Sequence, residues 1–452
     1  MYIMLICAVV LLAGATVDTA EAQDGVQLTP KEQLGKAIFF DENLSLNQNQ
    51  ACAACHAPAS GWTGPDEGIN TGGAVYEGSI PGRFGDRKPP SAAYATLSPV
   101  FHQDKKGLFI GGNFWDGRAT GDVLGNPAAD QALGPFLNPN EQALPDSACV
   151  VYRVCNPVTP GDYPVAFEEV WGEAACDIAW PGNVDAVCAA QGTTVDLSMA
   201  DRTLSDRNYG NIGLSIAAYE DSPEVNAFSS KYDATFMGAD KLDKLEQKGY
   251  ALFRGKAKCQ NCHPANGQGA LFTDYTFDNL GIPLNPENPA YNANSGSVDF
   301  GLGRFLEIAN YPVNFYLAER GKHKVPTLRN VDLRPDESFV KAYSHNGYFK
   351  TLEGIVNFYN TRDVKPVCPG PYTEAEALAA GCWPAPEVAA NINRDELGNL
   401  GLTPDEEAAI VAFLKTLSDG HFDPMAIAVE GTASAAAAPS EMQHFFLPVI
   451  HH

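Results

Sequence analysis

Apolar residues recur at helical spacing in a few separated stretches of the chain. In residues 241–253 the apolar positions are Leu242, Leu245, Tyr250 and Phe253, a spacing typical of a helix with one buried face. Similar patterns predict further helices, which fall at residues 30–40, 207–219, 351–359 and from 403 onward. The pattern therefore predicts a mainly α protein.

Two of these helices have a clear start signal. Thr29 precedes Pro30, and Thr403 precedes Pro404, so each pair combines an N-cap residue with a proline at the first helical position. The segments between the helices lack strong helical periodicity or are rich in Gly, Pro and Ser, notably 57–112 and 143–200. We therefore expect helices joined by long irregular segments.

Composition and charge limit the possible functions. The chain has 452 residues, 45% of them hydrophobic, and a formal net charge of −25. The length suits two or three folded domains. The strong acidic balance argues against binding to nucleic acid or to anionic membranes. It favours a basic protein partner, or it only keeps the protein soluble.

The two ends of the chain differ from the rest. Residues 1–15 are almost entirely apolar, and Ala20-Glu21-Ala22 follows as a small-x-small cleavage pattern. We predict a signal peptide at 1–22 and a periplasmic or extracellular protein. No Lys or Arg precedes Lys31, so an uncleaved anchor is the alternative. Residues 430–452 are rich in Ala and Ser and are predicted to be a disordered tail.

The chain carries two Cys-x-x-Cys-His motifs, each after a predicted helix. In this motif the two thiols attach to the haem vinyl groups and the adjacent His binds the iron. A redox Cys-x-x-Cys or a zinc site would not explain a His after the second Cys in both cases. Two covalently bound haem c groups are therefore predicted, held by Cys52, Cys55 and His56, and by Cys259, Cys262 and His263.

Six further cysteines remain outside the haem motifs and the predicted signal peptide. An even number in an exported chain suggests three disulfides. We expect the pairs that are close in sequence, namely Cys149–Cys155, Cys176–Cys188 and Cys368–Cys382. Four of these cysteines fall in 143–200, which we interpret as a loop-rich, disulfide-stapled insertion.

A helix flanks each haem motif, which predicts two cytochrome-c-like haem domains packed together. We place them at residues 23–205, including the insertion, and at 206–429. Methionines are scarce near either motif: none lies between Met4 and Met199, and only Met425 and Met442 follow His263. The common His/Met pair of iron ligands is therefore not expected. One iron is expected to be open, and the other to use His or Tyr, with His323 as a reserve candidate.

Several longer motifs resemble the bacterial dihaem cytochrome c peroxidase family, and within it the MauG-like branch. The similarity covers roughly residues 30–142 and 205–420. It is carried by segments such as Leu34–Asp41, Asn113–Ala119 (Asn-Phe-Trp-Asp-Gly-Arg-Ala), Gly134–Glu141 (Gly-Pro-Phe-Leu-Asn-Pro-Asn-Glu), Lys324–Val331 (Lys-Val-Pro-Thr-Leu-Arg-Asn-Val) and Tyr343–Gly347 (Tyr-Ser-His-Asn-Gly).

The resemblance implies a reaction site at the first haem. Family peroxidases with a resting distal His carry it soon after the first motif, but this chain has none there. The haem on His56 would thus be open to peroxide. Glu141 would be the acid–base group, and Gln131 matches a distal-pocket Gln of the MauG branch. Trp115 would lie between the haems and relay electrons.

The resemblance also assigns the second haem to electron transfer. Peroxidases of the family place a Met fourteen residues after the His of the Tyr-x-His motif, whereas MauG-like members place a Tyr there. In this chain that position is Tyr359, fourteen residues after His345. A Tyr ligand would lower the haem potential relative to Met. The alternative is an ordinary buried helix Tyr.

One family feature is altered. Family members hold a calcium between the haems, using an Asn and two carbonyls near a Thr-x-Pro. Here Lys88 replaces the Asn, and Val340 and Ala342 replace the Thr and Pro. A protonated Lys cannot be a calcium ligand, so we predict that the Lys88 ammonium takes the place of calcium. An exposed surface Lys is the alternative.

Three functions follow from these features. The first is a peroxidase that reduces hydrogen peroxide with electrons from a small cytochrome or cupredoxin. The second is a MauG-like oxidase that modifies Trp or Tyr of a partner protein, although no Trp that could relay oxidation to such a partner lies just before the second haem motif. The third is a non-enzymatic dihaem electron carrier. The sequence makes no prediction of oligomeric state.

Overall fold

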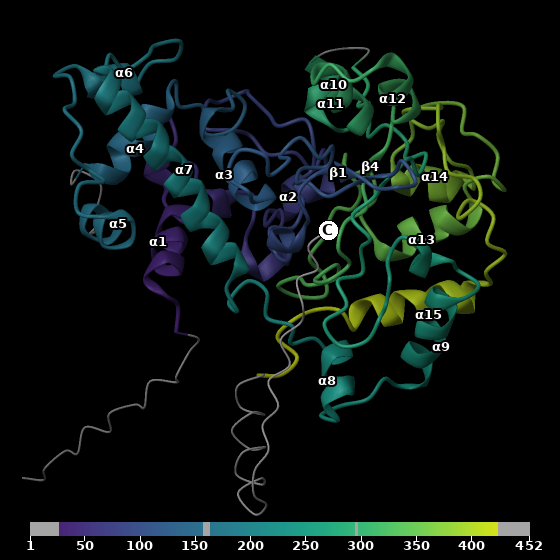
Figure 1. Ribbon diagram of the computed structural model, residues 1–452. Coiled ribbons are helices and arrows are strands. Elements are labelled where there is room, and N and C mark those ends of the chain that lie inside the picture. Colours follow the sequence, from purple (N-terminus) through teal and green to yellow (C-terminus); the bar gives the residue numbers. More distant parts are fainter. Residues whose placement is uncertain (1–26, 157–162, 294–296, 424–452) are drawn as a thin grey trace, which may run out of the picture.

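The computed structural model describes residues 27–156, 163–293 and 297–423. The predicted signal peptide and the Ala/Ser-rich tail lie outside these ranges. The described chain forms two lobes side by side, the first drawn in purple to teal and the second in teal to yellow (Figure 1). The prediction of a mainly α protein with two cytochrome-c-like domains packed together is confirmed.

The first lobe consists of helices around one apolar core. Its helices are α1 (Pro30–Phe39), α2 (Glu67–Thr71), α3 (Pro127–Leu137), α4 (Ser147–Cys155), α5 (Tyr163–Trp171), α6 (Val184–Cys188) and α7 (Met199–Asp221). A short antiparallel pair, β1 (His102–Gln103) and β2 (Phe109–Ile110), reaches the second lobe, where Phe109 packs against Phe315. The core contains Leu34, Phe136, Val150 and Tyr219. The predicted domain boundary at 205/206 falls inside α7, whose buried residues belong to this core.

The second lobe has its own core and a similar helical composition. Its helices are α8 (Lys231–Met237), α9 (Lys244–Arg254), α10 (Pro289–Ala293), α11 (Leu302–Ile308), α12 (Val313–Ala318), α13 (Leu352–Thr361), α14 (Glu374–Ala380) and α15 (Pro404–Lys415). Strands β3 (Phe277–Asp278) and β4 (His323–Lys324) pair antiparallel. Phe253, Phe272, Phe358, Trp383 and Phe413 form the centre of this core.

The predicted helix starts at Thr29 and Thr403 are confirmed. In each case the Thr side chain accepts a hydrogen bond from the backbone N–H of a Glu three residues on, and that Glu accepts one from the Thr backbone. These reciprocal bonds satisfy backbone donors that the first helical turn leaves free.

A glycine allows the same close helix crossing in each lobe. A Cβ added at Gly35 of α1 would lie 1.9 Å from the carbonyl oxygen of Ser215 on α7. A Cβ added at Gly249 of α9 would lie 1.9 Å from the carbonyl oxygen of Ala409 on α15. In both lobes the helix before the haem motif therefore touches the backbone of a later helix, and this contact fixes where the motif begins.

Gly249→Ala should lower the free energy of unfolding by about 1–3 kcal/mol, because the new methyl group forces the two backbones apart. Chemical denaturation of the haem-loaded protein measures the change. Gly182→Ala is the matched control, since its Cβ would meet open space. Equal stability of the two variants would show that the crossing tolerates a side chain.

The insertion is stapled by disulfides, but with a different pairing from the one predicted. The bonds are Cys149–Cys188 and Cys155–Cys176, whereas Cys368–Cys382 is as predicted. The predicted pair Cys149–Cys155 fails for a geometric reason. Cys149 and Cys155 lie on one helix, α4, where six residues rise about 9 Å, too far for a disulfide. The insertion also contains helices α4, α5 and α6, which the sequence pattern did not predict.

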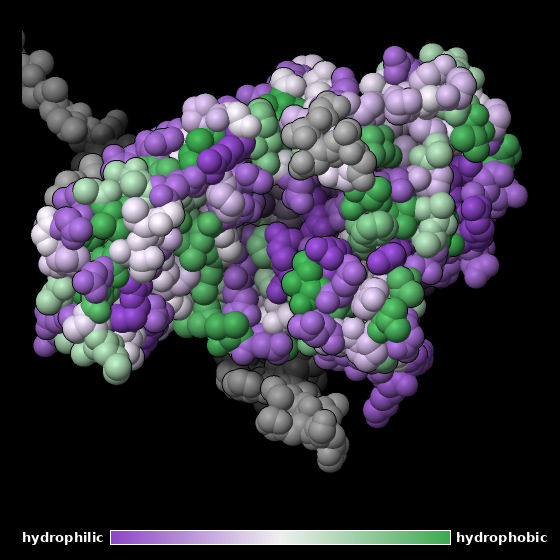
Figure 2. Space-filling model, turned by 90° about the horizontal axis from the view of Figure 1, so that it is seen from above, coloured by the Kyte–Doolittle hydropathy of each residue, from purple (hydrophilic) through white to green (hydrophobic). Residues whose placement is uncertain are grey.

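None of the helices in the described ranges has the length and apolar character needed to span a membrane. Seen from above, hydrophilic residues cover much of the surface and hydrophobic patches interrupt them on both lobes (Figure 2). Ile308 at the end of α11 and Val313 at the start of α12 are among the exposed apolar side chains. Scattered exposure of this kind is ordinary for a folded protein.

Candidate functional site

Both Cys-x-x-Cys-His motifs line one cavity of about 410 Å³ between and within the two lobes. The cavity wall includes the two thiols and the His of each motif, namely Cys52, Cys55, His56, Cys259, Cys262 and His263. Residues far apart in sequence therefore converge on one cavity.

The first motif folds as a tight turn that orients His56. Cys52 begins a short 3₁₀ turn, and the His56 backbone N–H donates to the Cys52 carbonyl at 3.0 Å. The His56 Nδ1 donates to the carbonyl of Trp62 at 3.3 Å. Burial lowers the pKa of His56 to about 4. The imidazole is thus neutral, with Nε2 left as the atom that can bind a metal.

The second motif repeats this arrangement around His263. Cys259 begins a 3₁₀ turn, and the His263 backbone N–H donates to the Cys259 carbonyl at 2.9 Å. The His263 Nδ1 donates to the carbonyl of Phe272 at 2.6 Å. Burial also lowers the pKa of His263. Trp62 and Phe272 both have left-handed backbone, with φ of 61° and 51°, so the same local geometry presents each carbonyl.

The four thiols are suited to covalent attachment rather than to redox or zinc chemistry. None of them is in a disulfide, and burial raises the pKa of Cys52 and of Cys259 to about 12. A redox Cys-x-x-Cys instead has a thiol with a lowered pKa. Within the described residues, no cluster that could hold a metal ion contains both cysteines of a motif. The donor set fits haem c.

Helix α3 and the turn after it form another wall of the first compartment, which is the part of the cavity next to Cys52, Cys55 and His56. Gln131, Pro135 and Glu141 all line the cavity. Burial raises the pKa of the Glu141 carboxyl, while the Arg118 guanidinium opposes that shift. The structure therefore brings the side chains of Glu141 and Gln131, two of the three predicted catalytic residues, to the cavity that His56 also lines.

Helix α13 faces the second compartment, which is the part of the cavity next to Cys259, Cys262 and His263. Leu352, Ile355, Val356 and Tyr359 line the cavity, and their spacing puts them on one face of the helix. Burial raises the pKa of Tyr359, and the neighbouring Cys259 and Cys262 contribute to the shift. Tyr359 thus shares its compartment with the second motif.

Trp115 lies at the junction of the two lobes and lines the cavity. Its indole Nε1 donates to the carbonyl of Lys88 at 2.8 Å, and its own carbonyl accepts from the backbone N–H of Lys324 at 2.8 Å. One bond stays within the first lobe and the other crosses to β4 of the second. Trp115 is therefore bonded to both lobes through its side chain and its backbone.

A family model described as di-haem cytochrome c peroxidase matches residues 29–241. The methylamine utilization protein MauG of Paracoccus denitrificans is 32% identical over 424 residues, which cover 92% of this chain and 95% of that protein. The chain belongs to the di-haem cytochrome c peroxidase family. Members of this family carry two c-type haems.

Other relatives include both peroxidases and MauG proteins. The cytochrome-c peroxidase IdrP1 of Denitromonas iodatirespirans is 27% identical over 410 residues, which cover 87% of this chain and 83% of that protein. The crystal structure of the diheme peroxidase BthA from Burkholderia thailandensis superposes with a TM-score of 0.66. It is 26% identical and covers 89% of this chain and 90% of its own. These relatives establish a peroxidase-type oxidoreductase and leave its substrate open.

In this di-haem family member the same loop occurs once in each lobe. In residues 113–119 and 343–349 the first and last residues form an antiparallel bridge. Phe114 and Ser344, at the second position, and Gly117 and Gly347, at the fifth, all have positive φ. Trp115 and His345 occupy the same third position. The repeat is structural, since few of the side chains are alike.

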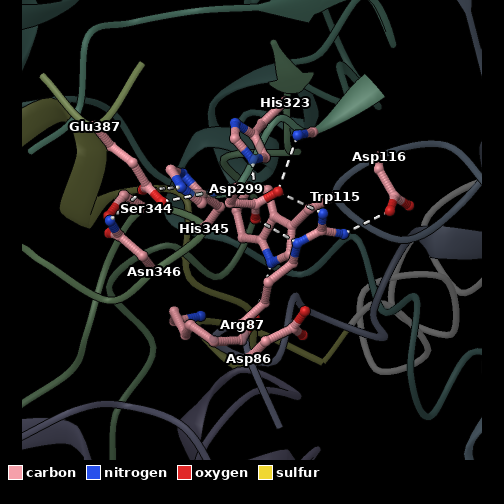
Figure 3. A network of polar contacts seen from close by, with 12 residues as sticks. Asp86, Arg87, Trp115, Asp116, Asp299, His323, Ser344, His345, Asn346 and Glu387 are labelled. Atoms are coloured by element: carbon pink, nitrogen blue, oxygen red, sulfur yellow. Dashed lines mark hydrogen bonds and ion pairs between the residues drawn. The ribbon is translucent and has the colours of Figure 1, made fainter. Parts of the chain in front are cut away.

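A network of charged side chains joins the two lobes beside Trp115 (Figure 3). The Arg87 guanidinium binds Asp116 at 2.7 Å in its own lobe and Asp299 at 2.6 Å in the other. The His323 and His345 rings stack with centroids 3.6 Å apart. His323 Nε2 lies 3.2 Å from Asp299, and His345 Nε2 lies 3.3 Å from Glu387. His323, the reserve iron ligand, belongs with Asp299 and His345 to a cluster that could hold a metal ion, and His102 is exposed.

Sequence reasoning missed several groups at the cavity. Glu220 of α7 is buried, and burial raises its pKa to about 8. Lys88 is also buried, so the interpretation as an exposed surface Lys is wrong. Lys324 and Lys341 line the same cavity. No sequence signal marked Glu220 or Lys341, because each is polar and only the fold shows that it faces inward.

Proposed function

We propose that this protein reduces hydrogen peroxide to water at the haem attached through Cys52, Cys55 and His56. Electrons arrive through the haem held by Cys259, Cys262, His263 and Tyr359. When bound, the haem irons supply the redox chemistry. The chain's own residues set which iron is open, move protons and connect the two sites.

The observation that carries this proposal is the difference between helices α3 and α13. On α3 the cavity-lining residues are Gln131, Ala132 and Pro135, and on α13 they include Ile355, Val356 and Tyr359. The spacing is the same in the two sets, so Pro135 takes the place of Tyr359. The proline side chain has no atom that can bind a metal, whereas a Tyr side-chain oxygen can. The first compartment therefore supports an open iron and the second a closed one.

The proton chemistry falls to Glu141 and Gln131. Conversion of peroxide into two waters consumes two electrons and two protons. Glu141 takes a proton from one peroxide oxygen and returns it to the other as the O–O bond breaks. Burial raises the pKa of Glu141, which suits a group that must both take up and release a proton. The Gln131 amide donates a hydrogen bond that orients the bound peroxide.

The route of the electrons is inferred from the position of Trp115, and the kind of electron donor from the net charge of the chain. Trp115 lines the cavity shared by both compartments, so it is placed to pass electrons between them. The net charge of −25 favours encounter with a basic donor at low salt. A small basic cytochrome or a small basic cupredoxin is the proposed reductant.

A second candidate is oxidation of a Trp or Tyr on a partner protein, driven by the same peroxide. It is favoured by Tyr359 and by the similarity to MauG of Paracoccus denitrificans. Steady-state peroxide turnover with reduced cytochrome c separates the two. Sustained oxidation of the cytochrome supports the peroxidase. Rapid bleaching of the haem spectrum by peroxide without turnover would support the oxidase, and no response to peroxide would leave only an electron carrier.

Tyr359→Phe should raise the midpoint potential of the second haem, because it removes an anionic oxygen ligand that favours ferric iron. Spectroelectrochemical titration of the purified protein measures this potential. Tyr348→Phe is the matched control, since Tyr348 is a buried Tyr of the same core whose hydroxyl donates to the Tyr372 carbonyl. An unchanged potential in Tyr359→Phe would identify Tyr359 as a packing residue.

A further inference from the structure

Two buried lysines from different lobes line the haem cavity. Lys88 is 7% exposed and Lys341 is 4% exposed, and both belong to the cavity wall. Within the described residues neither ammonium has a carboxylate at ion-pair distance. Burying a charge without a counter-charge is costly, so a bound anion would stabilise the charged form of both lysines.

The Lys88 ammonium is held by two neutral oxygens. Its Nζ donates to Thr63 Oγ1 at 2.7 Å and to the Pro89 carbonyl at 2.9 Å. Its backbone N–H donates to the His345 carbonyl of the other lobe at 2.8 Å. An ammonium has three N–H donors, so one donor of Lys88 remains for a ligand in the cavity.

The Lys341 ammonium has a matching environment. Its Nζ donates to the Asn330 carbonyl at 2.7 Å and to the Leu333 carbonyl at 2.9 Å. A Cβ added at Gly61 would lie 2.8 Å from this Nζ, so a glycine of the first lobe leaves room for it. Lys341 therefore also retains one donor, and its ammonium reaches the wall that carries the first haem motif.

The two charges act on each other. Burial lowers the pKa of Lys88 to about 7, and burial together with the charge of Lys88 lowers the pKa of Lys341 well below its ordinary value. Lys324 differs, because three oxygens already accept from its Nζ, those of Ser98, Gly112 and Asn113. Lys88 and Lys341 are thus the pair that gains most from a bound anion.

We infer that Lys88 and Lys341 form a paired-ammonium site that binds a carboxylate, a propionate of the covalently attached haem. Haem c brings carboxylates into this cavity, and each lysine offers one unused donor to them. The inference concerns how the haem is held and does not depend on which substrate is oxidised. It rests only on haem attachment, which a pyridine haemochrome assay reports separately.

The lysine pair also supplies the positive charge that a calcium ion would bring between the lobes. Lys88 stands where the family carries an Asn ligand, and a protonated Lys cannot bind calcium. Lys341 lies between Val340 and Ala342, whose carbonyls would be the remaining ligands. The donor set therefore does not fit calcium, and the chain provides the charge itself.

The test compares Lys88→Met and Lys341→Met in the haem-loaded protein. Each should lower a haem midpoint potential, because loss of a nearby cation favours the ferric state, and should shift the propionate bending mode in the resonance Raman spectrum. Lys88→Arg should stay close to the unmodified protein in both readouts, since it keeps the charge. Lys350→Met is the matched control, because the Lys350 ammonium donates to the Gly72 and Gly347 carbonyls outside the cavity.

Four results would overturn the inference. The first is equal potentials and propionate modes in both Lys→Met variants and in Lys350→Met. The second is a potential that depends on added chloride or acetate while the propionate mode stays constant, which would indicate a free anion. The third is one tightly bound calcium per chain in metal analysis of the unmodified protein. A loss of thermal stability alone, shared with Lys350→Met, would show a merely structural role and counts against the site.

Discussion

Glu141→Gln should lower kcat for peroxide reduction by about 10²–10⁴-fold, the usual effect of removing a positioned acid–base group. The amide keeps the size of the side chain but cannot take up and return a proton. Glu141 lines the cavity that His56 also lines, and burial raises its pKa. Stopped-flow and steady-state assays with reduced cytochrome c measure the loss.

The raised pKa of Glu141 adds a pH signature. In a plot of kcat against pH, the change in kcat caused by titration of this carboxyl should lie at a higher pH than an exposed Glu would give. The same change should be absent in Glu141→Gln. Glu173→Gln is the control, since Glu173 is exposed on the surface. A kcat for Glu141→Gln within threefold of the unmodified enzyme would assign proton transfer to another group.

Asp233→Asn should lower the free energy of unfolding by about 3–5 kcal/mol, the cost of leaving a buried charge without its partner. Asp233 accepts two hydrogen bonds from the Arg329 guanidinium, both at 2.8 Å, and both side chains are almost wholly buried. Asp233 also accepts from Ser230 at the start of α8. The Asn variant keeps the shape and loses the charge.

The pH dependence of this effect has a definite sign. Arg329 holds the pKa of Asp233 below its ordinary value. The ion pair therefore stabilises the native state at neutral pH, and this contribution is lost as the pH falls through the native pKa. Asp336→Asn, at an exposed carboxyl, should leave the stability almost unchanged. Denaturant titration of both variants at neutral and acid pH checks the sign, and equal losses at both sites would contradict the account.

Much of the candidate site could be predicted because its signals are local in sequence. A Cys-x-x-Cys-His motif is contiguous, so its chemistry can be recognised without the fold. The caps at Thr29 and Thr403 are also local, since each depends on a residue three positions away. Tyr359 is nominated by the resemblance to the family, which places a ligand fourteen residues after the position of His345, and the fold puts it on the cavity-lining face of α13.

The remaining features depend on contacts that no local pattern encodes. Lys88 and Lys341 are more than 250 positions apart, and only the packing of the two lobes brings both to one cavity wall. Cys149 pairs with Cys188 because helix α4 carries Cys155 away from it. Gly35 is an unremarkable helix residue in sequence, and its role becomes visible only where α1 meets α7.

The central claim is that the two haem compartments are unequal, one open because α3 presents Pro135 and one closed by Tyr359. An electron paramagnetic resonance spectrum of the ferric unmodified protein tests it most directly. The account predicts one high-spin signal, from the haem on His56, and one low-spin signal, from the haem on His263. Two low-spin signals would show a sixth ligand at both irons and would contradict the account.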